Sequence, residues 1–255
     1  MKPIGIYDSG VGGLTVLKEL TQKFPHENFI YFADTKHLPY GDKSKEQITQ
    51  YSHDIVSGFQ NTMNAKMAIA ACNTSSALAL DTISNDFHIP IIGTIYPLLH
   101  HIHEAKTIGI IATQASANSR MHEKIFKNHG FKGEVISVGC PKFTPLIEEG
   151  DFDSAKLQEC ASEYLSIFQS QKIDTLIYGC THYPFIKNLI ESLLPPFIKY
   201  IDPAHYIAQE VKKILPQESE IGSIQYYCSS NPELFSKKLR NLMGTDSEVK
   251  LWDLK

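Results

Sequence analysis

The sequence lacks both long hydrophobic runs and clusters of positive charge. No run reaches the 18 or more apolar residues that a transmembrane helix requires. The formal net charge is −4 and no run of Lys or Arg is present, so nucleic-acid binding as the main activity is disfavoured. The N-terminus carries no apolar segment ahead of a small-residue cleavage site. We therefore expect a cytoplasmic protein without a nucleic-acid or membrane partner.

Cysteine is scarce, and its spacing excludes two common uses. Five cysteines, an odd number spread widely along the chain, do not form a disulfide framework. No Cys-x-x-Cys pair is present, so we predict no structural zinc and no metal cofactor. A small buried hydrophobic side chain is the simplest explanation for any single member of the set Cys72, Cys140, Cys160, Cys180 and Cys228. A solvated helix face likewise explains three other possible ligands better than metal binding does: His100, His101 and His103.

A nucleotide-binding glycine loop is also missing. The segment Gly10-Val11-Gly12-Gly13 fails the G-x-G-x-x-G pattern because Thr15 stands at the last glycine position. It fails the P-loop pattern because no Gly-Lys-Ser/Thr follows. Asp8, just ahead of the loop, would repel a phosphate. We therefore predict no nucleotide cofactor.

What the sequence does contain is an alternation of short apolar runs with helical patterns. Strands are expected at 4–7, 29–32, 67–71 and 89–92. Leu14, Leu17 and Leu20 recur at helical spacing, and a second helical stretch covers 76–83. In the tail, a helix is expected at 206–215, a strand at 223–228, and a helix at 231–243 capped by Ser229 or Ser230. Such alternation is typical of an α/β protein with a parallel sheet.

The same order of segments returns at offsets that rise from 104 to 109 residues. The matches are Ile4-Gly5-Ile6 with Ile108-Gly109-Ile110, Pro39-Tyr40-Gly41 with Pro145-Leu146-Ile147, Ala71-Cys72-Asn73 with Gly179-Cys180-Thr181, and strand ends at Gly93 and Asp202. We predict two similar parallel-sheet α/β domains related by a pseudo-twofold duplication, with the active site in the cleft between them. Their expected bounds are 1–94 plus 206–255 for the first domain and 95–205 for the second.

The duplication places two thiols where a ligand is expected. Ligands of open α/β sheets bind beyond the carboxyl ends of the strands. Asp8-Ser9, Cys72-Asn73-Thr74, Thr113 and Cys180-Thr181-His182 all follow expected strands. Two halves packed face to face would put one cysteine on each wall of a shared cleft. Because each thiol lies near an expected helix N-terminus, we predict a lowered thiol pKa, which suits acid/base catalysis near neutral pH.

Thiols on opposite walls are suited to inverting a carbon centre. One thiolate removes a proton from one face, and the opposite thiol returns a proton to the other face. Asp8 could hold an ammonium group. Donors for substrate carboxylates are offered by Ser9, Asn73, Thr74, Thr113 and Thr181. These features predict an amino-acid racemase, although charge and spacing leave the length of the substrate side chain open.

Four segments resemble the signature segments of bacterial glutamate racemases, in the family's order and over nearly the whole chain. They are Asp8-Ser9-Gly10-Val11-Gly12-Gly13-Leu14, Pro39-Tyr40-Gly41, Ala71-Cys72-Asn73-Thr74 and Gly179-Cys180-Thr181-His182-Tyr183-Pro184. The resemblance implies interconversion of L- and D-glutamate for peptidoglycan synthesis, without pyridoxal phosphate or metal. It also implies a homodimer and a C-terminal tail that returns to the first domain.

The resemblance implies a role for each matching position. Cys72 takes the proton of the D-isomer with help from Asp8, and Cys180 takes that of the L-isomer. Glu148 and His182 assist Cys180. The implied substrate contacts are Asp8, Ser9, Pro39, Tyr40, Gly41, Asn73, Thr74, Thr113, Thr181 and His182. Two positions depart from the family pattern and put loop contacts in doubt: His37 in place of a frequent Arg, and Ser116 in place of a common Thr.

Three other readings stay open from the sequence. An aspartate racemase, or a related amino-acid racemase, would use the same thiol pair. A small-molecule binding protein of the same fold would bind without turnover. A hydrolase or lyase with Cys72 as nucleophile and His182 as its base would leave Cys180 unexplained.

Overall fold

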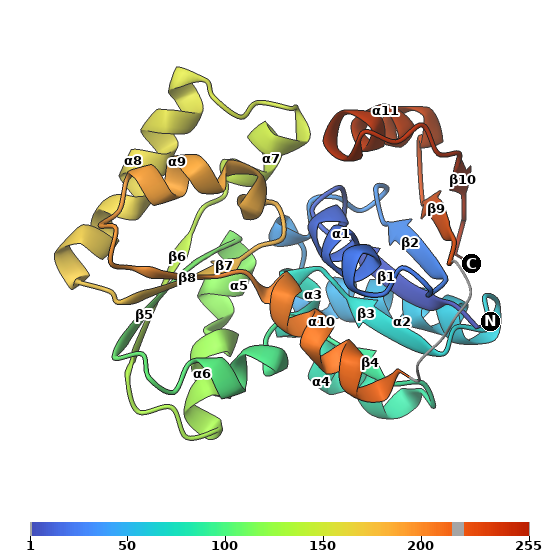
Figure 1. The fold of residues 1–255 in the computed structure, drawn as a ribbon, viewed down its shortest axis with the longest axis horizontal. Coiled ribbons are helices and arrows are strands. Elements are labelled where there is room, and N and C mark those ends of the chain that lie inside the picture. The colour runs from blue at the N-terminus through green and yellow to red at the C-terminus, as the bar shows by residue number, and fades with distance from the viewer. Residues whose placement is uncertain (1, 216–221, 255) are drawn as a thin grey trace.

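Two α/β halves lie side by side in the computed structural model, which describes residues 2–215 and 222–254 (Figure 1). The first half contains a six-stranded parallel sheet in the order β10-β9-β2-β1-β3-β4. Its strands are β1 (Ile4–Asp8), β2 (Phe29–Ala33), β3 (Met67–Ala70), β4 (Ile91–Ile92), β9 (Ile224–Cys228) and β10 (Val249–Leu251). Its helices are α1 (Leu14–Lys23), η1 (Tyr40–Asp42), α2 (Lys45–Asn61), α3 (Asn73–Leu78), α4 (Leu80–Ile83), η2 (Ser84–Asp86), α10 (Pro203–Ile214) and α11 (Pro232–Met243).

The second half contains a four-stranded parallel sheet in the order β6-β5-β7-β8. Its strands are β5 (Thr107–Ala112), β6 (Glu134–Gly139), β7 (Thr175–Gly179) and β8 (Lys199–Ile201). Its helices are α5 (Gln114–Ser119), α6 (Met121–Asn128), α7 (Phe143–Glu148), α8 (Ala155–Gln171) and α9 (Lys187–Ser192), with short turns η3 (Tyr96–His101) and η4 (Tyr183–Ile186).

The duplication expected from the sequence is visible in the order of the strands. The order β2-β1-β3-β4 in one sheet corresponds strand for strand to β6-β5-β7-β8 in the other. All residues of β1, β2, β3 and β7 are buried, because helices cover both faces of the sheets. Two parallel-sheet α/β units, as predicted, are therefore confirmed.

The tail after β8 returns to the first half. The residues Ala204, Ile207 and Val211 of α10 join the same hydrophobic cluster as Leu14 and Leu17 of α1. Strand β9 then pairs with β2, and β10 extends the sheet beyond β9. The predicted domain bounds, 1–94 plus 206–255 and 95–205, stay a prediction, and residues 1, 216–221 and 255 of the first lie outside the described residues.

Local details correct three expectations. The cap of α11 is Asn231, whose Oδ1 accepts the Leu234 N–H at 3.2 Å, and not a serine. Ser229 is unavailable because its hydroxyl donates to Asp34 Oδ1 at 2.7 Å. The expected helix 76–83 begins earlier, at Asn73, and is interrupted between α3 and α4. Strand β4 is shorter than predicted.

The helices of the described chain are short or carry many polar residues. Across residues 2–215 and 222–254, none of them combines the length and the apolar character that crossing a bilayer requires.

Candidate active site

Strand ends from both sheets meet where the two halves face each other. Asp8 is the last residue of β1, and Cys72 caps the N-terminus of α3 just after β3. In the second half, Thr113 caps α5 directly after β5, and Cys180 follows β7. The short strand-to-helix connections therefore bring side chains that are distant in sequence to one place.

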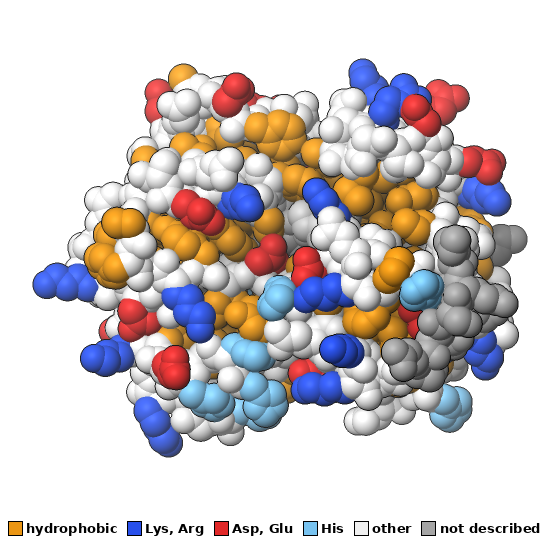
Figure 2. Space-filling model, viewed as in Figure 1, with side chains coloured by type: hydrophobic (Ala, Val, Ile, Leu, Met, Phe, Trp, Pro, Cys, Tyr) orange, Lys and Arg blue, Asp and Glu red, His pale blue; other side chains and the backbone are white. Residues whose placement is uncertain are grey.

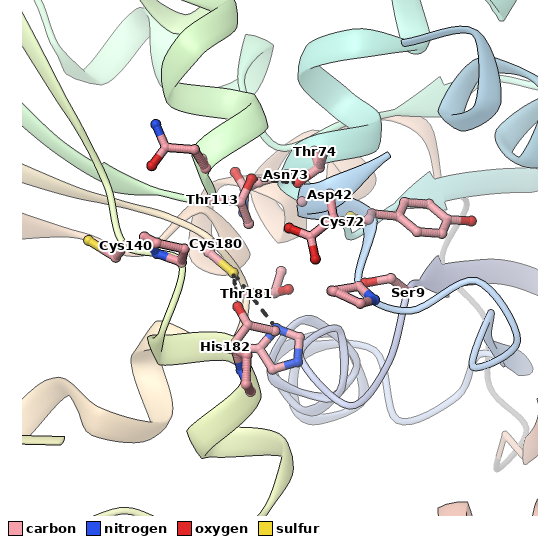
Figure 3. A pocket seen from close by; sticks show the side chains of 17 residues that line it. Ser9, Asp42, Cys72, Asn73, Thr74, Thr113, Cys140, Cys180, Thr181 and His182 are labelled. Atoms are coloured by element: carbon pink, nitrogen blue, oxygen red, sulfur yellow. Dashed lines mark hydrogen bonds between the residues drawn. The ribbon is translucent and has the colours of Figure 1, made fainter. Parts of the chain in front are cut away.

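Cys72 and Cys180 approach a single cavity from different sides (Figure 3). Each cysteine is buried, with 4% of its surface exposed. Eleven of the thirteen predicted site residues line this cavity, and Asp8 and Glu148 lie behind its walls. The lining consists of Ser9, Pro39, Tyr40, Gly41, Asp42, Cys72, Asn73, Thr74, Thr113, Gln114, Cys140, Pro141, Thr144, Pro145, Cys180, Thr181 and His182.

The wall around Cys180 carries an imidazole and a hydroxyl group. His182 Nδ1 lies 3.7 Å from Cys180 Sγ, and Thr144 Oγ1 lies at the same distance from that sulfur. The other ring nitrogen of His182 lies 2.8 Å from Glu148 Oε1. Burial alone would lower the pKa of His182, but the hydrogen bonds and charges of Cys180 and Glu148 raise it well above its ordinary value. These partners therefore favour the protonated, cationic form of the ring beside the sulfur.

Glu148 supports this arrangement from behind the cavity. Its Oε1 also accepts the Val11 N–H at 3.0 Å, and its Oε2 accepts a hydrogen bond from Lys238 Nζ. Burial raises the pKa of Glu148, but His182 and Lys238 overcome that effect and lower it to about 2. The carboxylate is therefore charged at neutral pH.

The wall around Cys72 carries a buried carboxyl group, that of Asp8, where the Cys180 wall carries an imidazole. Asp8 is fully buried; its Oδ1 accepts the Gly10 N–H at 2.8 Å and its Oδ2 accepts the Thr181 hydroxyl at 2.9 Å. Burial raises the pKa of Asp8. Burial, followed by the charge of Asp8, raises the pKa of Cys72 to about 12. The predicted lowering of this thiol pKa by the helix N-terminus is wrong, because the Ser75 N–H opposes burial only weakly.

The polar lining of the cavity includes an unpaired donor. Asn73 Oδ1 accepts the Thr94 hydroxyl at 2.7 Å, whereas Asn73 Nδ2 is buried without a hydrogen-bond partner in the described part of the chain. Nearby, the hydroxyl oxygens of Thr74 and Thr113 lie 3.0 Å apart and join the two halves. Ser116 adds a hydroxyl group to this cluster, 3.1 Å from Thr113 Oγ1.

The segment before Tyr40 is fixed by one buried carboxylate. Asp34 Oδ2 accepts the Tyr40 hydroxyl at 2.6 Å and lies 2.8 Å from His37 Nδ1. The His37 ring also stacks on Tyr51 with a centroid separation of 3.9 Å. His37 therefore holds the loop through Asp34 and Tyr51.

Sequence reasoning missed several residues that the structure brings to the cavity. They are Asp42, Gln114, Cys140, Pro141, Thr144 and Pro145. The internal repeat carried a usable signal, because it matched Pro145 to Pro39 and so pointed to the segment that contains Thr144. Of the suggested histidine ligands, His101 packs on the Tyr206 ring at 4.3 Å. Within residues 2–215 and 222–254, no three His, Cys, Asp or Glu side chains are grouped to hold a metal ion.

Comparison with known proteins settles the family. The sequence profile of the Asp/Glu/Hydantoin racemase family matches residues 9–211. The chain belongs to this family. It is 41% identical to a glutamate racemase of Gloeothece citriformis over 248 residues, which cover 95% of this chain and 89% of the relative. The resemblance to glutamate racemases that the sequence motifs indicated is confirmed.

Solved structures agree with this assignment. A Francisella tularensis glutamate racemase in complex with D-glutamate is 32% identical, with a TM-score of 0.92 over 100% of this chain and 98% of that one. A Bacillus anthracis glutamate racemase isoform is 29% identical, with a TM-score of 0.93 over 99% of this chain and 98% of that one. An aspartate racemase homologue of Pyrococcus horikoshii, at 14% identity and a TM-score of 0.60 over 84% of this chain and 99% of that one, is similar in fold alone.

Proposed function

We propose that this protein interconverts L- and D-glutamate, with Cys72 and Cys180 as a two-thiol acid/base pair and without an added cofactor. One observation carries the proposal: two buried thiols from equivalent positions of a duplicated fold line the same cavity from different sides. A single nucleophile would need only one of them. Racemisation needs both, because the proton leaves one face of Cα and arrives at the other.

The proposed reaction consists of two proton transfers. The Cys180 thiolate removes the α-proton of L-glutamate, and the electron pair of the C–H bond remains as a planar carbanion. The Cys72 thiol then gives its proton to the opposite face and becomes a thiolate, so that D-glutamate is released. The imidazolium of His182, at 3.7 Å, compensates the charge on Cys180 Sγ before the first transfer. In the reverse direction the two thiols exchange roles.

The polar lining supports an amino-acid substrate. We propose that the unpaired Asn73 Nδ2 and the hydroxyl groups of Ser9, Thr74, Thr113 and Thr181 bind the carboxylates of glutamate. A buried donor without a partner costs free energy, and a carboxylate oxygen would satisfy it. Further substrate contacts are proposed for Pro39, Tyr40, Gly41 and His182. Asp8, behind the wall, is proposed to assist Cys72, and Glu148 to assist Cys180 through His182.

Proton NMR of L-glutamate in heavy water tests the proposal directly. Loss of the α-proton signal, together with D-glutamate in a chiral separation, is the expected result with purified, reduced protein and no added cofactor. If aspartate but not glutamate undergoes exchange and inversion, the proposed substrate is wrong and the proposed mechanism stands. No exchange with either amino acid would refute racemisation and favour a binding protein.

The thiol pair is tested by replacing one cysteine at a time. Cys72→Ser and Cys180→Ser are each expected to lower kcat/KM by at least about 10²-fold, since a positioned acid or base contributes roughly 10²–10⁴-fold. Activity that survives Cys180→Ser but not Cys72→Ser would instead indicate a single nucleophile. The matched control is Cys160→Ser, a buried cysteine outside the cavity, which is expected to keep turnover.

The setting of the reaction is also a proposal. We propose that the protein supplies D-glutamate for peptidoglycan synthesis in the cytoplasm and that it acts as a homodimer, as its family membership suggests. Light scattering after size-exclusion chromatography tests the oligomeric state: the mass of a dimer is expected, and a mass near the 28.7 kDa of one chain would contradict the dimer.

A further inference from the structure

A line of alternating charges leads from the cavity to the protein surface. It begins at Cys180 Sγ, passes through the two ring nitrogens of His182 and the carboxylate of Glu148, and ends at the ammonium group of Lys238. The exposed fraction of the side chain rises outward, from 2% for His182 to 8% for Glu148 and 25% for Lys238. The proposed acid/base wall is therefore connected to a residue outside the cavity.

Lys238 reaches this wall from the other half of the molecule. It belongs to α11, which packs with the first sheet, whereas Glu148 ends α7 of the second half. Figure 1 shows α11 and α7 facing each other across the gap between the halves. In Figure 2, hydrophobic side chains gather in the hollow between these two lobes. This groove is lined by Ile147, Glu148, Phe152, Leu234, Lys238 and Leu242, among others.

We propose that Lys238 is a positioning residue for the Cys180 wall, acting through Glu148 on His182. This inference rests on the proposed racemisation. Lys238 holds Oε2 of Glu148, which leaves Oε1 directed at both the Val11 N–H and His182 Nε2. Without the ammonium group, Oε2 has no hydrogen-bond partner among the described residues, and the carboxylate can turn away from the imidazole.

The sum of the charges gives a second reason. When Cys180 is a thiolate, the four groups from Cys180 through His182 and Glu148 to Lys238 carry alternating negative and positive charges, which sum to zero. Removal of the ammonium group leaves one net negative charge in a largely buried cluster, and burial penalises uncompensated charge. This cost destabilises the thiolate form of Cys180, which is the base for L-glutamate. Lys238 therefore favours the reactive form of Cys180 without touching the substrate.

The test compares three variants of the full-length protein. Lys238→Met removes the charge at similar length and is expected to lower kcat/KM about tenfold, part of the roughly 10²–10⁴-fold that a positioned acid or base supplies. Lys238→Arg keeps the charge and is expected to lie nearer the wild type than Met does. The control, Lys237→Met, changes an exposed neighbour on the same helix and is expected to leave kcat/KM unchanged. Equal loss in the Met and Arg variants at position 238 would overturn the proposal.

Deuterium isotope effects distinguish positioning from a general loss of structure. Cys180 breaks the Cα–D bond of deuterated L-glutamate, and Cys72 breaks that of deuterated D-glutamate. Because the enantiomers have equal free energies, kcat/KM must fall equally in both directions. In Lys238→Met, however, the Cys180 step becomes more rate-limiting, so the isotope effect on kcat/KM should rise for L-glutamate and fall towards 1 for D-glutamate. As ratios, these values do not depend on how much of the protein is folded.

A double variant checks that the effect passes through Glu148. If Lys238 acts only on that carboxylate, Lys238→Met should cause little further loss in a Glu148→Gln background, instead of multiplying the two losses. Independent losses, or isotope effects that stay unchanged for both enantiomers, would overturn the proposal. An inactive wild-type protein would refute the racemase itself, whereas an active wild type with an equally active Lys238→Met variant would refute only this inference.

Discussion

Gly12 occupies the position where one added methyl group would strike the Cys180 wall most directly. A Cβ at this position would meet His182 Nδ1 and Thr181 Oγ1, and would lie 2.7 Å from His182 Cε1. Real Cβ atoms essentially never come within 3.0 Å of such neighbours. The ring cannot swing aside freely, because Cys180 and Glu148 hold its two nitrogens. In Gly12→Ala, the imidazole must therefore move within the site.

The size of the expected effect follows from this geometry. Overpacking of this kind costs about 1–3 kcal/mol, and each kcal/mol lowers Tm by roughly 2–4 °C in a protein of this size. A shift of about 1 Å in a reacting group can cost about 10²-fold in rate. We therefore expect Gly12→Ala to lose about 10²-fold in kcat for both glutamate enantiomers, with a fall in Tm of only several degrees.

A matched variant separates activity from stability. A Cβ on Gly5 would lie 2.5 Å from Phe59 Cδ2, so Gly5→Ala causes similar overpacking in the core of the first half, away from the cavity. Circular dichroism melts and a chiral turnover assay should find a lower Tm in both variants and a large loss of kcat in Gly12→Ala alone. The reasoning is refuted if Gly12→Ala keeps the wild-type kcat, or if Gly5→Ala loses as much.

Three further predictions concern charge and hydrogen bonding. The folded-state pKa of Glu148, about 2, lies below the unfolded value of about 4.3. The ionised carboxylate therefore adds about 3 kcal/mol to the free energy of unfolding, and this contribution should disappear as the pH falls from about 4 towards 2. The free energies of unfolding of Glu148→Gln and the wild type, measured by urea titration, should converge over that range. Burial lowers the pKa of His122 to about 4, so the wild type should lose up to about 3 kcal/mol between pH 6.5 and 4, and a His122→Gln variant that loses as much would contradict this. Tyr40→Phe removes the hydroxyl bound to Asp34 and should cost about 1–3 kcal/mol and raise KM, as melts and saturation kinetics can measure.

The fold was largely predictable because its signals are local and repeated. Alternating apolar runs identified β1, β2 and β3 to within one residue at each end, and the repeat predicted two similar parallel-sheet units, whose strand orders do match in the structure. The cap of α11 was not predictable in the same way. Two serines and Asn231 compete for that role, and a tertiary contact between Ser229 and Asp34 decides between them.

The candidate site was predictable where strand ends carry it and unpredictable where burial decides the chemistry. Position in the repeat pointed to Cys72 and Cys180 together. It gave no information on Lys238, which lies in the tail that has no counterpart in the repeat. The pKa of Cys72 was predicted in the wrong direction because the sequence shows the helix N-terminus but not the exclusion of water, which is the larger effect here.

The repeat gave the two walls the same backbone, and the residues around each thiol then made them different. Asp8, a buried carboxyl group, accompanies Cys72, whose raised pKa of about 12 keeps it a thiol. His182, a buried cation, accompanies Cys180 and compensates a negative sulfur. Under the proposed mechanism, the two walls therefore differ in charge: a buried imidazole paired with Glu148 lies beside Cys180, and a buried carboxyl group lies beside Cys72. After each conversion of L- to D-glutamate the protonation states of the two thiols are exchanged, so the protein must restore them before it can accept L-glutamate again.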